Sequence, residues 1–468
     1  MHFQRGNTAR PLLVLALLFG LAGSALGAAD DENGWNAAAR RDYAKLEAQM
    51  AARKNGELAG VWGAMGVEAG GLLRGLRFKK VEYRNGEDFD PEGKSIEYLV
   101  TRTGRKVSPL VVFFPGVFGD ARGAGGLLVA RQVRRARNHA VILPNPWGEN
   151  FQNARPRFFP GEFDREAKAL GGIVNAAIEF IGPERISEIH FVGESHGGFL
   201  APATAAIINR EGKYHVSSVT SISVPFHIGN AVNALDEMAD EGEKAYFEGG
   251  CKLTFVRALG FVYEMLRNPK TVEVYSKDGT PCSKAIFAFM GFEKPLFSLA
   301  KKVNERAPSA AWAAEPESYW ERKVRFRDLG PLFYGKPTRE IVGQASADLG
   351  TWLNAARAEG VRTLALVAKD DPLNPPPEIG SFKVIGSYDP RDILVLSKGG
   401  HLGFRGSRFY RKIVRDQFKI AVNAPPTAAV DGTSAEAPDD ALDNDVRPAN
   451  DDYAAEDARE DAAEAAAD

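Results

Sequence analysis

The chain has 468 residues, and its apolar, charged and aromatic fractions of 44%, 26% and 10% are typical of a soluble globular protein. They exclude a largely disordered chain, and the length suffices for a large core. The formal net charge is −2, but it is unevenly spread, because residues 431–468 hold fourteen acidic and two basic residues. A mildly basic body therefore precedes an acidic tail, and we expect no nucleic-acid partner.

The first residues are typical of an export signal. Arg5 and Arg10 precede an apolar run at 11–22, and small residues then allow cleavage before Ala28. The run is short for a bilayer core of about 30 Å, although an uncleaved anchor remains an alternative. We expect a signal peptide at 1–27, no membrane span after its removal, and a periplasmic or extracellular protein.

Two cysteines, Cys251 and Cys282, belong to a chain that we expect to leave the cytoplasm. In an oxidising compartment they can form one intrachain disulfide. Two unpaired buried thiols are the alternative, since sequence spacing does not establish that they lie close together.

Apolar strand patterns alternate with helical patterns through most of the chain. Strands are predicted at 76–83, 95–102, 109–114, 139–143, 186–192, 216–224, 361–368 and 392–396. Helices are predicted at 35–53, where we expect a surface helix, and at 125–137, 165–181 and 197–209. This alternation predicts an α/β protein with a mostly parallel central sheet and helices on both faces.

The same patterns divide the chain into parts. After the signal we expect an N-terminal helical segment at 28–75, and a core formed by 76–225 and 345–423. Residues 226–344 lack strand patterns and predict an inserted helical cap. Residues 424–468 are rich in Pro, Ala, Asp and Glu, and we expect a disordered acidic tail.

Residues 193–198 read Gly-Glu-Ser-His-Gly-Gly and follow a predicted strand directly. A G-x-S-x-G sequence between a strand and a helix is typical of a nucleophilic serine on a sharp turn. Gly193 and Gly197 flank the turn where strand and helix approach closely. We therefore predict Ser195 as a nucleophile.

A nucleophilic serine needs a base and an orienting acid, which follow it in the order acid, then histidine. Asp370 and Asp371 follow the predicted strand 361–368, and His401 follows the next predicted strand, 392–396. The carboxyl ends of parallel strands meet at one edge of the sheet. We predict a Ser195, Asp371 and His401 triad, with Asp370 as the alternative acid.

The remaining part of such a site is an oxyanion hole, made of backbone N–H groups. One donor is predicted at His196, after the nucleophile, and the other at Val117, in the loop after strand 109–114. His190 and His196 have no ligand partner at a recognised spacing, so we expect no metal site. We also expect no cofactor.

Together these motifs resemble the YheT-like esterase family of α/β-hydrolases. The stretch FFPGVFGD resembles its oxyanion loop, RFFPGEFDREA at 157–167 resembles a segment before a helix, and GGHLGF at 399–404 resembles its histidine motif. The resemblance covers roughly residues 76–422. It implies an α/β-hydrolase fold and hydrolysis of carboxylic esters, often acyl or lipid-like esters, without a metal.

The sequence also departs from the family pattern. Pro115 stands where the loop motif has histidine, and Phe159 and Pro160 stand where the family has histidine and serine. The predicted cap is larger than expected, so the substrate class does not carry over. These departures bear on the oxyanion hole and on specificity.

Three functions remain open. The first is an exported serine hydrolase that cleaves small-molecule or lipid-like esters through an acyl-enzyme. The second is a peptidase or amidase on the same triad, with Glu241 and Glu243 holding an amine, although these residues also fit a solvated helix face. The third is a non-catalytic binding protein that uses its cap and tail.

Aromatic residues are frequent in the predicted cap. They either line an acyl pocket or form the cap's own core. These residues are Phe247, Phe255, Phe261, Phe287, Phe289, Phe292 and Phe297.

Overall fold

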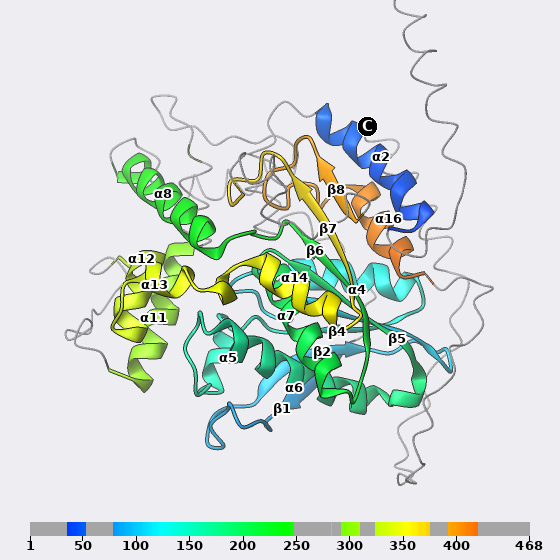
Figure 1. Cartoon of the computed structure of the whole chain (residues 1–468), viewed down its shortest axis with the longest axis horizontal. Coiled ribbons are helices and arrows are strands. Elements are labelled where there is room, and N and C mark those ends of the chain that lie inside the picture. The colour runs from blue at the N-terminus through cyan, green and yellow to red at the C-terminus, as the bar shows by residue number, and fades with distance from the viewer. Residues whose placement is uncertain are drawn as a thin grey trace, which may run out of the picture.

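The computed structural model describes residues 35–52, 78–247, 282, 292–308, 323–374 and 392–419, which build one eight-stranded sheet flanked by helices (Figure 1). The strands lie in the order β1-β2-β4-β3-β5-β6-β7-β8. β1, β2 and β4 pair antiparallel, and the pairs from β4 through β3 to β8 are parallel. The strands are β1 (Lys79–Tyr83), β2 (Ile96–Thr101), β3 (Ser108–Phe114), β4 (His139–Ile142), β5 (Ile186–Glu194), β6 (Val216–Ile222), β7 (Arg362–Ala368) and β8 (Ile393–Leu396).

Helices cover both faces of the sheet, which explains why its central strands are apolar on both sides. In β3, Val112 and Phe114 pack into the hydrophobic cluster under one helical layer. Val111 and Phe113 pack into the cluster under the other layer. The first layer is α6 (Phe163–Ile181), α7 (His196–Glu211) and α14 (Leu349–Ala358), and the second is α2 (Ala37–Ala51), α4 (Ala124–Arg135) and α16 (Arg408–Gln417).

The described part of the chain between β6 and β7 is helical, and several of its helices lie together at the left of Figure 1. Phe297 and Phe326 are buried there and join the same cluster as the first helical layer. These helices are α8 (Ile228–Phe247), α11 (Lys294–Arg306), α12 (Phe326–Leu329), α13 (Thr338–Val342) and the helical turns η5 (Gly330–Tyr334) and η6 (Ala345–Ala347). Two shorter elements elsewhere are α5 (Glu149–Asn153) and η2 (Pro183–Arg185).

The N-terminal helix α2 packs one face against the protein and leaves the other exposed, as the predicted surface helix does. Trp35, Leu46 and Met50 are buried against the sheet and α16. The indole Nε1 of Trp35 donates to the backbone oxygen of Asp392, and the hydroxyl of Tyr43 donates to that of Val395. The apolar residues on one face of α2 hold this helix beside β8. Their spacing in the sequence is too weak to show this face clearly.

The strand order and the turn from β5 into α7 define the α/β-hydrolase fold, which confirms the predicted fold class. The predicted signal, Cys251, and the predicted tail lie outside the described residues. Among the residues that the structure describes, none of the helices is both long enough and apolar enough to cross a membrane.

Candidate functional site

Ser195 occupies the sharp turn between β5 and α7. Its backbone has φ 53° and ψ −125°, a conformation that a residue with a side chain adopts only under strain. The N–H of Ser195 donates to the carbonyl of Ile222 at 2.9 Å, which fixes the turn to β6. Strain of this kind, held by neighbouring strands, is typical of a nucleophile that must stand clear of the backbone.

Only glycine fits on either side of this turn. A Cβ atom on Gly193 would lie 2.3 Å from the carbonyl oxygen of Gly197. A Cβ atom on Gly197 would lie 2.2 Å from the carbonyl oxygen of Phe114. Both obstacles are backbone atoms, so a side-chain rotation cannot relieve them.

Ser195, His401 and Asp371 form a continuous hydrogen-bonded chain. The Oγ of Ser195 lies 2.9 Å from Nε2 of His401, and Nδ1 of His401 lies 3.1 and 3.0 Å from the two carboxylate oxygens of Asp371. Because Nδ1 faces a carboxylate, it carries the proton, and Nε2 is free to accept the hydroxyl proton. All three side chains are buried.

The two adjacent aspartates have different partners. Asp371 contacts His401, whereas Oδ1 of Asp370 accepts a hydrogen bond from the N–H of Gly400 at 2.7 Å. Asp371 also accepts from the N–H of Leu373 at 3.0 Å, which orients its carboxylate. Asp370 therefore holds the loop that carries His401.

The loop after β3 passes directly over the serine. A Cβ atom on Gly116 would lie 3.3 Å from Cβ of Ser195, so the backbone at this glycine lies close to the serine side chain. The N–H of Gly119 donates to the carbonyl of Gly116 at 2.9 Å, and Phe118 has φ 59°, which closes a tight turn around Val117. His196 is the first residue of α7, so its N–H has no acceptor within that helix.

A buried polar cluster lies behind this loop, and sequence reasoning missed it. Asn145, after β4, donates to the carbonyl of Pro115 at 2.9 Å and contacts Nδ1 of His196 at 3.1 Å. Trp147 donates through Nε1 to Oε1 of Glu166 at 3.0 Å. A polar residue at the carboxyl end of a buried strand was the available signal for Asn145.

The two titratable members of this cluster are kept neutral by burial. Loss of solvent raises the pKa of Glu166 to about 8 and lowers the pKa of His196 to about 3. The Oε2 of Glu166 lies 3.7 Å from Nε2 of His196. Glu166 belongs to the 157–167 stretch that carries the family resemblance, and its Oε1 accepts from the N–H of Gly161 at 2.6 Å.

Glu194, the residue before the serine, forms a buried ion pair with Arg405. Its Oε1 accepts hydrogen bonds from Nε of Arg405 at 3.2 Å and from the hydroxyl of Tyr410 at 3.0 Å. The burial of Tyr410 and the nearby carboxylate raise the pKa of that phenol well above its ordinary value. The pair fixes the turn to α16 without contacting the serine oxygen.

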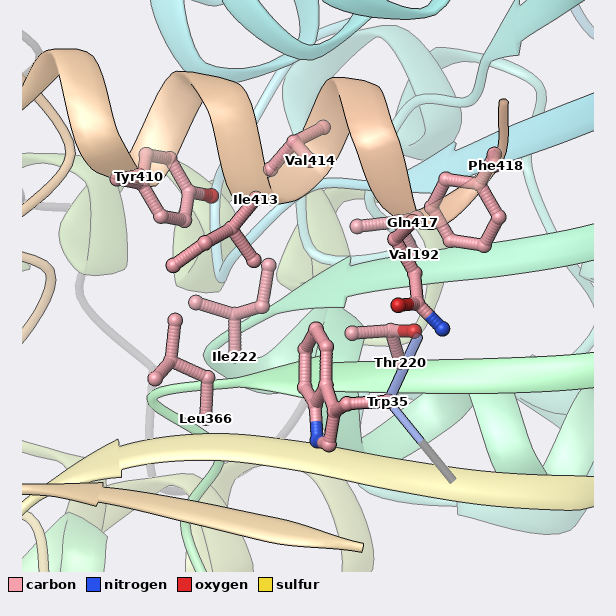
Figure 2. Close-up of a pocket in the computed structure, with 10 residues that line it drawn as sticks. All are labelled: Trp35, Val192, Thr220, Ile222, Leu366, Tyr410, Ile413, Val414, Gln417 and Phe418. Carbon is pink, nitrogen blue, oxygen red and sulfur yellow. The ribbon is translucent and has the colours of Figure 1, made fainter. Parts of the chain in front are cut away.

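Figure 2 shows a small cavity on the α16 side of the sheet. Its volume of about 10 Å³ is near that of a single water probe, too small for an organic substrate. The residues that line it are Trp35, Val192, Thr220, Ile222, Leu366, Tyr410, Ile413, Val414, Gln417 and Phe418. The cavity is thus a packing gap beneath α2 and α16 and contains none of the predicted site residues.

Glu241 and Glu243, which the sequence offered as an amine-binding pair, do not form a paired site. Glu243 accepts from Arg325 at 2.6 Å and also pairs with Lys323. Glu241 is exposed on the same helix α8. Arg325 also pairs with Asp240 at 2.9 Å, so Glu243 belongs to an ion-pair network rather than to a substrate site.

Two of the seven cap aromatics have described side chains. Phe297 is buried in the main cluster, and the ring of Phe292 lies 6.4 Å from that of Phe326. Phe326 also lies 6.0 Å from Trp147 and 6.4 Å from Phe118 in the loop after β3. These rings join the inserted helices to the loop above the serine. The other five predicted residues lie outside the described side chains.

The two histidines weighed as metal ligands have separate partners. His190 contacts Ser218 at 2.9 Å and Glu188 at 3.0 Å, whereas His196 contacts Asn145. Within the described ranges, no three His, Cys, Asp or Glu side chains are grouped to hold a metal ion. Cys282 is buried, but its predicted partner Cys251 lies outside the described residues, so the pairing stays a prediction.

No family model matches the chain, and no curated protein matches it. Among solved structures, it is similar to carboxyl esterase 2 of the fungus Tuber melanosporum, with 12% identity, coverage of 73% of this chain and 85% of that chain, and a TM-score of 0.41. It is also similar to an esterase of Pyrococcus furiosus, with 11% identity, coverage of 74% and 90%, and a TM-score of 0.40.

A thermostable carboxyl esterase of Bacillus coagulans shows 12% identity, coverage of 68% of this chain and 89% of that chain, and a TM-score of 0.36. Likenesses of this size carry no argument about activity. The resemblance to the YheT-like family stays a prediction, and the function has to be argued from the site itself.

Proposed function

We propose that this chain is an exported serine hydrolase that cleaves carboxylic esters of small-molecule or lipid-like substrates. The observation that carries the proposal is the hydrogen-bonded chain from Ser195 through His401 to Asp371. It stands at the carboxyl ends of β5, β7 and β8, where parallel sheets of this kind gather their reactive groups.

In the proposed reaction the Oγ of Ser195 attacks the acyl carbon while its proton passes to Nε2 of His401. The carboxylate of Asp371 holds the imidazole and stabilises its positive charge. The proton then moves to the oxygen of the leaving alcohol, and the C–O bond of the ester breaks. Water, deprotonated by His401, attacks the acyl-enzyme, which releases the acid and restores Ser195.

The negative oxygen of each tetrahedral intermediate is assigned to the N–H groups of Val117 and His196. The close approach of Gly116 to Ser195 and the position of His196 at the start of α7 support this assignment. Pro115 at the loop's start does not prevent it, because the donors are backbone groups further along.

A fluorophosphonate probe tests the proposal directly. We expect the wild type to be labelled and Ser195→Ala to remain unlabelled, with both proteins folded by circular dichroism. A folded wild type that resists labelling would contradict the proposal. Rates on p-nitrophenyl esters and on aminoacyl p-nitroanilides then separate ester from amide hydrolysis, and faster anilide turnover would replace the esterase by an amidase.

The export part of the proposal rests on the pattern at 1–27. N-terminal sequencing of protein recovered from the periplasm or medium should begin at Ala28. A disulfide between Cys251 and Cys282 belongs to the same compartment. Mass spectrometry of a non-reduced digest should then find the two cysteine peptides linked, and finding them separate would contradict the pairing.

A further inference from the structure

Asn145 lies between two prolines at the carboxyl end of β4, and its side chain is 1% exposed. Its backbone N–H donates to the carbonyl of Gly119 at 2.9 Å. The residue therefore holds the far end of the loop that runs from Pro115 over the serine.

The side chain of Asn145 holds the near end of that loop and the start of α7 together. Its Oδ1 accepts from the N–H of Trp147 at 2.9 Å, which fixes which side of the amide is nitrogen. The Nδ2 group then donates to the carbonyl of Pro115 at 2.9 Å and to Nδ1 of His196 at 3.1 Å. His196 consequently carries its proton on Nε2.

A second layer keeps Asn145 in this orientation. The indole N–H of Trp147 donates a hydrogen bond to the fully buried Glu166, and the indole ring lies 5.5 Å from the ring of His196. Rotation of the Asn145 amide would break its hydrogen bonds to the N–H of Trp147 and to the carbonyl of Pro115, so one orientation of this side chain is favoured. Asn145 is thus a rigid link between two backbone segments.

We propose that Asn145 is the positioning residue of the oxyanion hole, an inference that rests on the proposed function. The loop it binds through Pro115 and Gly119 carries the N–H of Val117, and the residue it binds at the start of α7 carries the N–H of His196. Both donors must point at one oxygen, and stabilisation of an oxyanion depends on donors fixed in place before the reaction. Asn145 sets the spacing between them without contacting the substrate.

The test uses Asn145→Ala and Asn145→Leu, whose side chain has a similar shape to asparagine but no donor for the Pro115 carbonyl. On p-nitrophenyl butyrate we expect kcat to fall about 10- to 100-fold while KM changes by less than about twofold, because the lost contact acts in the transition state. The affinity for butylboronic acid, whose serine adduct has an oxyanion, should fall by the same factor as kcat.

Asn138→Ala is the matched control. Asn138 is equally buried at the other end of β4, where Nδ2 donates to the backbone oxygen of Phe418. The control should lower the melting temperature yet keep kcat and boronate affinity. Assays run well below each variant's melting temperature remove the effect of unfolding.

Three outcomes decide the matter. A selective loss of kcat and boronate affinity in the Asn145 variants supports the inference. Wild-type kcat in a folded Asn145→Leu, or an equal loss in Asn138→Ala, overturns it while leaving the proposed function intact. Failure of the wild type to label with fluorophosphonate is a different result, since it removes the proposed function and the inference with it.

Discussion

Asp370 accepts the N–H of Gly400 at 2.7 Å, while its neighbour Asp371 holds the imidazole of His401 at 3.0 Å. Two adjacent carboxylates at the end of β7 thus serve the same loop in different ways. One sets the path of the backbone, and the other sets the orientation of the ring.

This division predicts unequal effects of two matched substitutions. Asp371→Asn should lower kcat about 10³- to 10⁴-fold, because the amide no longer holds Nδ1–H and favours the wrong tautomer. Asp370→Asn keeps the shape and an acceptor oxygen for Gly400, and should lower kcat by less than about tenfold. Steady-state kinetics on an ester substrate measures both. Equal losses would show that the assignment of the acid is wrong.

A second prediction concerns stability and pH. The folded-state pKa of Glu166, about 8, is raised, so its proton is held in the folded protein but lost from the unfolded chain above pH 4.5. The folded-state pKa of His196 is lowered to about 3, so below pH 6.5 the unfolded chain takes up a proton at this residue that the folded protein does not. Between pH 4.5 and 6.5 the two groups change stability in opposite directions. From pH 6.5 to 8 only Glu166 of the two still lowers stability as pH rises.

Urea unfolding of wild type and Glu166→Gln across this range measures the difference. The variant carries no ionisable group at this position, so its stability relative to wild type should increase from pH 6.5 to 8. Below pH 4.5 the difference should be constant, because Glu166 is protonated in both states there. A pH-independent difference over the whole range would contradict the raised pKa.

The glycine after the serine predicts a steric effect. Gly197→Ala places a methyl group 2.2 Å from the carbonyl oxygen of Phe114, and should cost at least about 3 kcal/mol of unfolding free energy. Gly104→Ala is the control, since among the described residues beyond its chain neighbours no heavy atom lies within 4 Å of where its methyl group would stand. Denaturant unfolding should leave this control near wild type. Comparable losses in the two variants would point to a general glycine effect instead.

The packing of α2 makes a fourth prediction. Trp35 is 4% exposed and lines the small cavity beneath α16. Because Trp35→Ala would enlarge this cavity, it should lower the unfolding free energy by about 3 to 5 kcal/mol. Val107 is 46% exposed, and Val107→Ala should change it by less than about 0.5 kcal/mol. Thermal unfolding of the two variants compares them. An unchanged unfolding free energy in Trp35→Ala would contradict the packing of this side chain against α16 and the sheet.

The strands and the nucleophile turn were predictable because their signals are local. The buried strand 109–114 and the Gly-Glu-Ser-His-Gly turn each fix a conformation within a few residues. The sequence favoured Asp371 as the acid but left Asp370 open, since the spacing of two adjacent residues does not tell which carboxylate turns inward. The choice between them required the path of the 397–401 loop in space.

Asn145 and Glu166 were missed for a related reason. The contacts that give them a role are distant: Asn145 meets Pro115 and His196 at separations of 30 and 51 residues, and Glu166 meets Trp147 at 19. The position of Asn145 after a buried strand was the one available signal. The burial of Trp35 was missed because α2 alternates charges with small residues. The apolar face of α2 becomes clear only from its packing against β8 and α16 in the folded protein.

Helix α2 also constrains the order of assembly. The N–H of Asn36 donates to Gln417 across 381 positions, and Glu47 accepts from Ser397, next to the histidine loop. Helix α2 can therefore pack only after α16 has been synthesised. Contacts between residues so far apart in the sequence form late in folding. The contact between Ser195 and His401 spans 206 positions, so it too can form only after β7 and β8 have been synthesised.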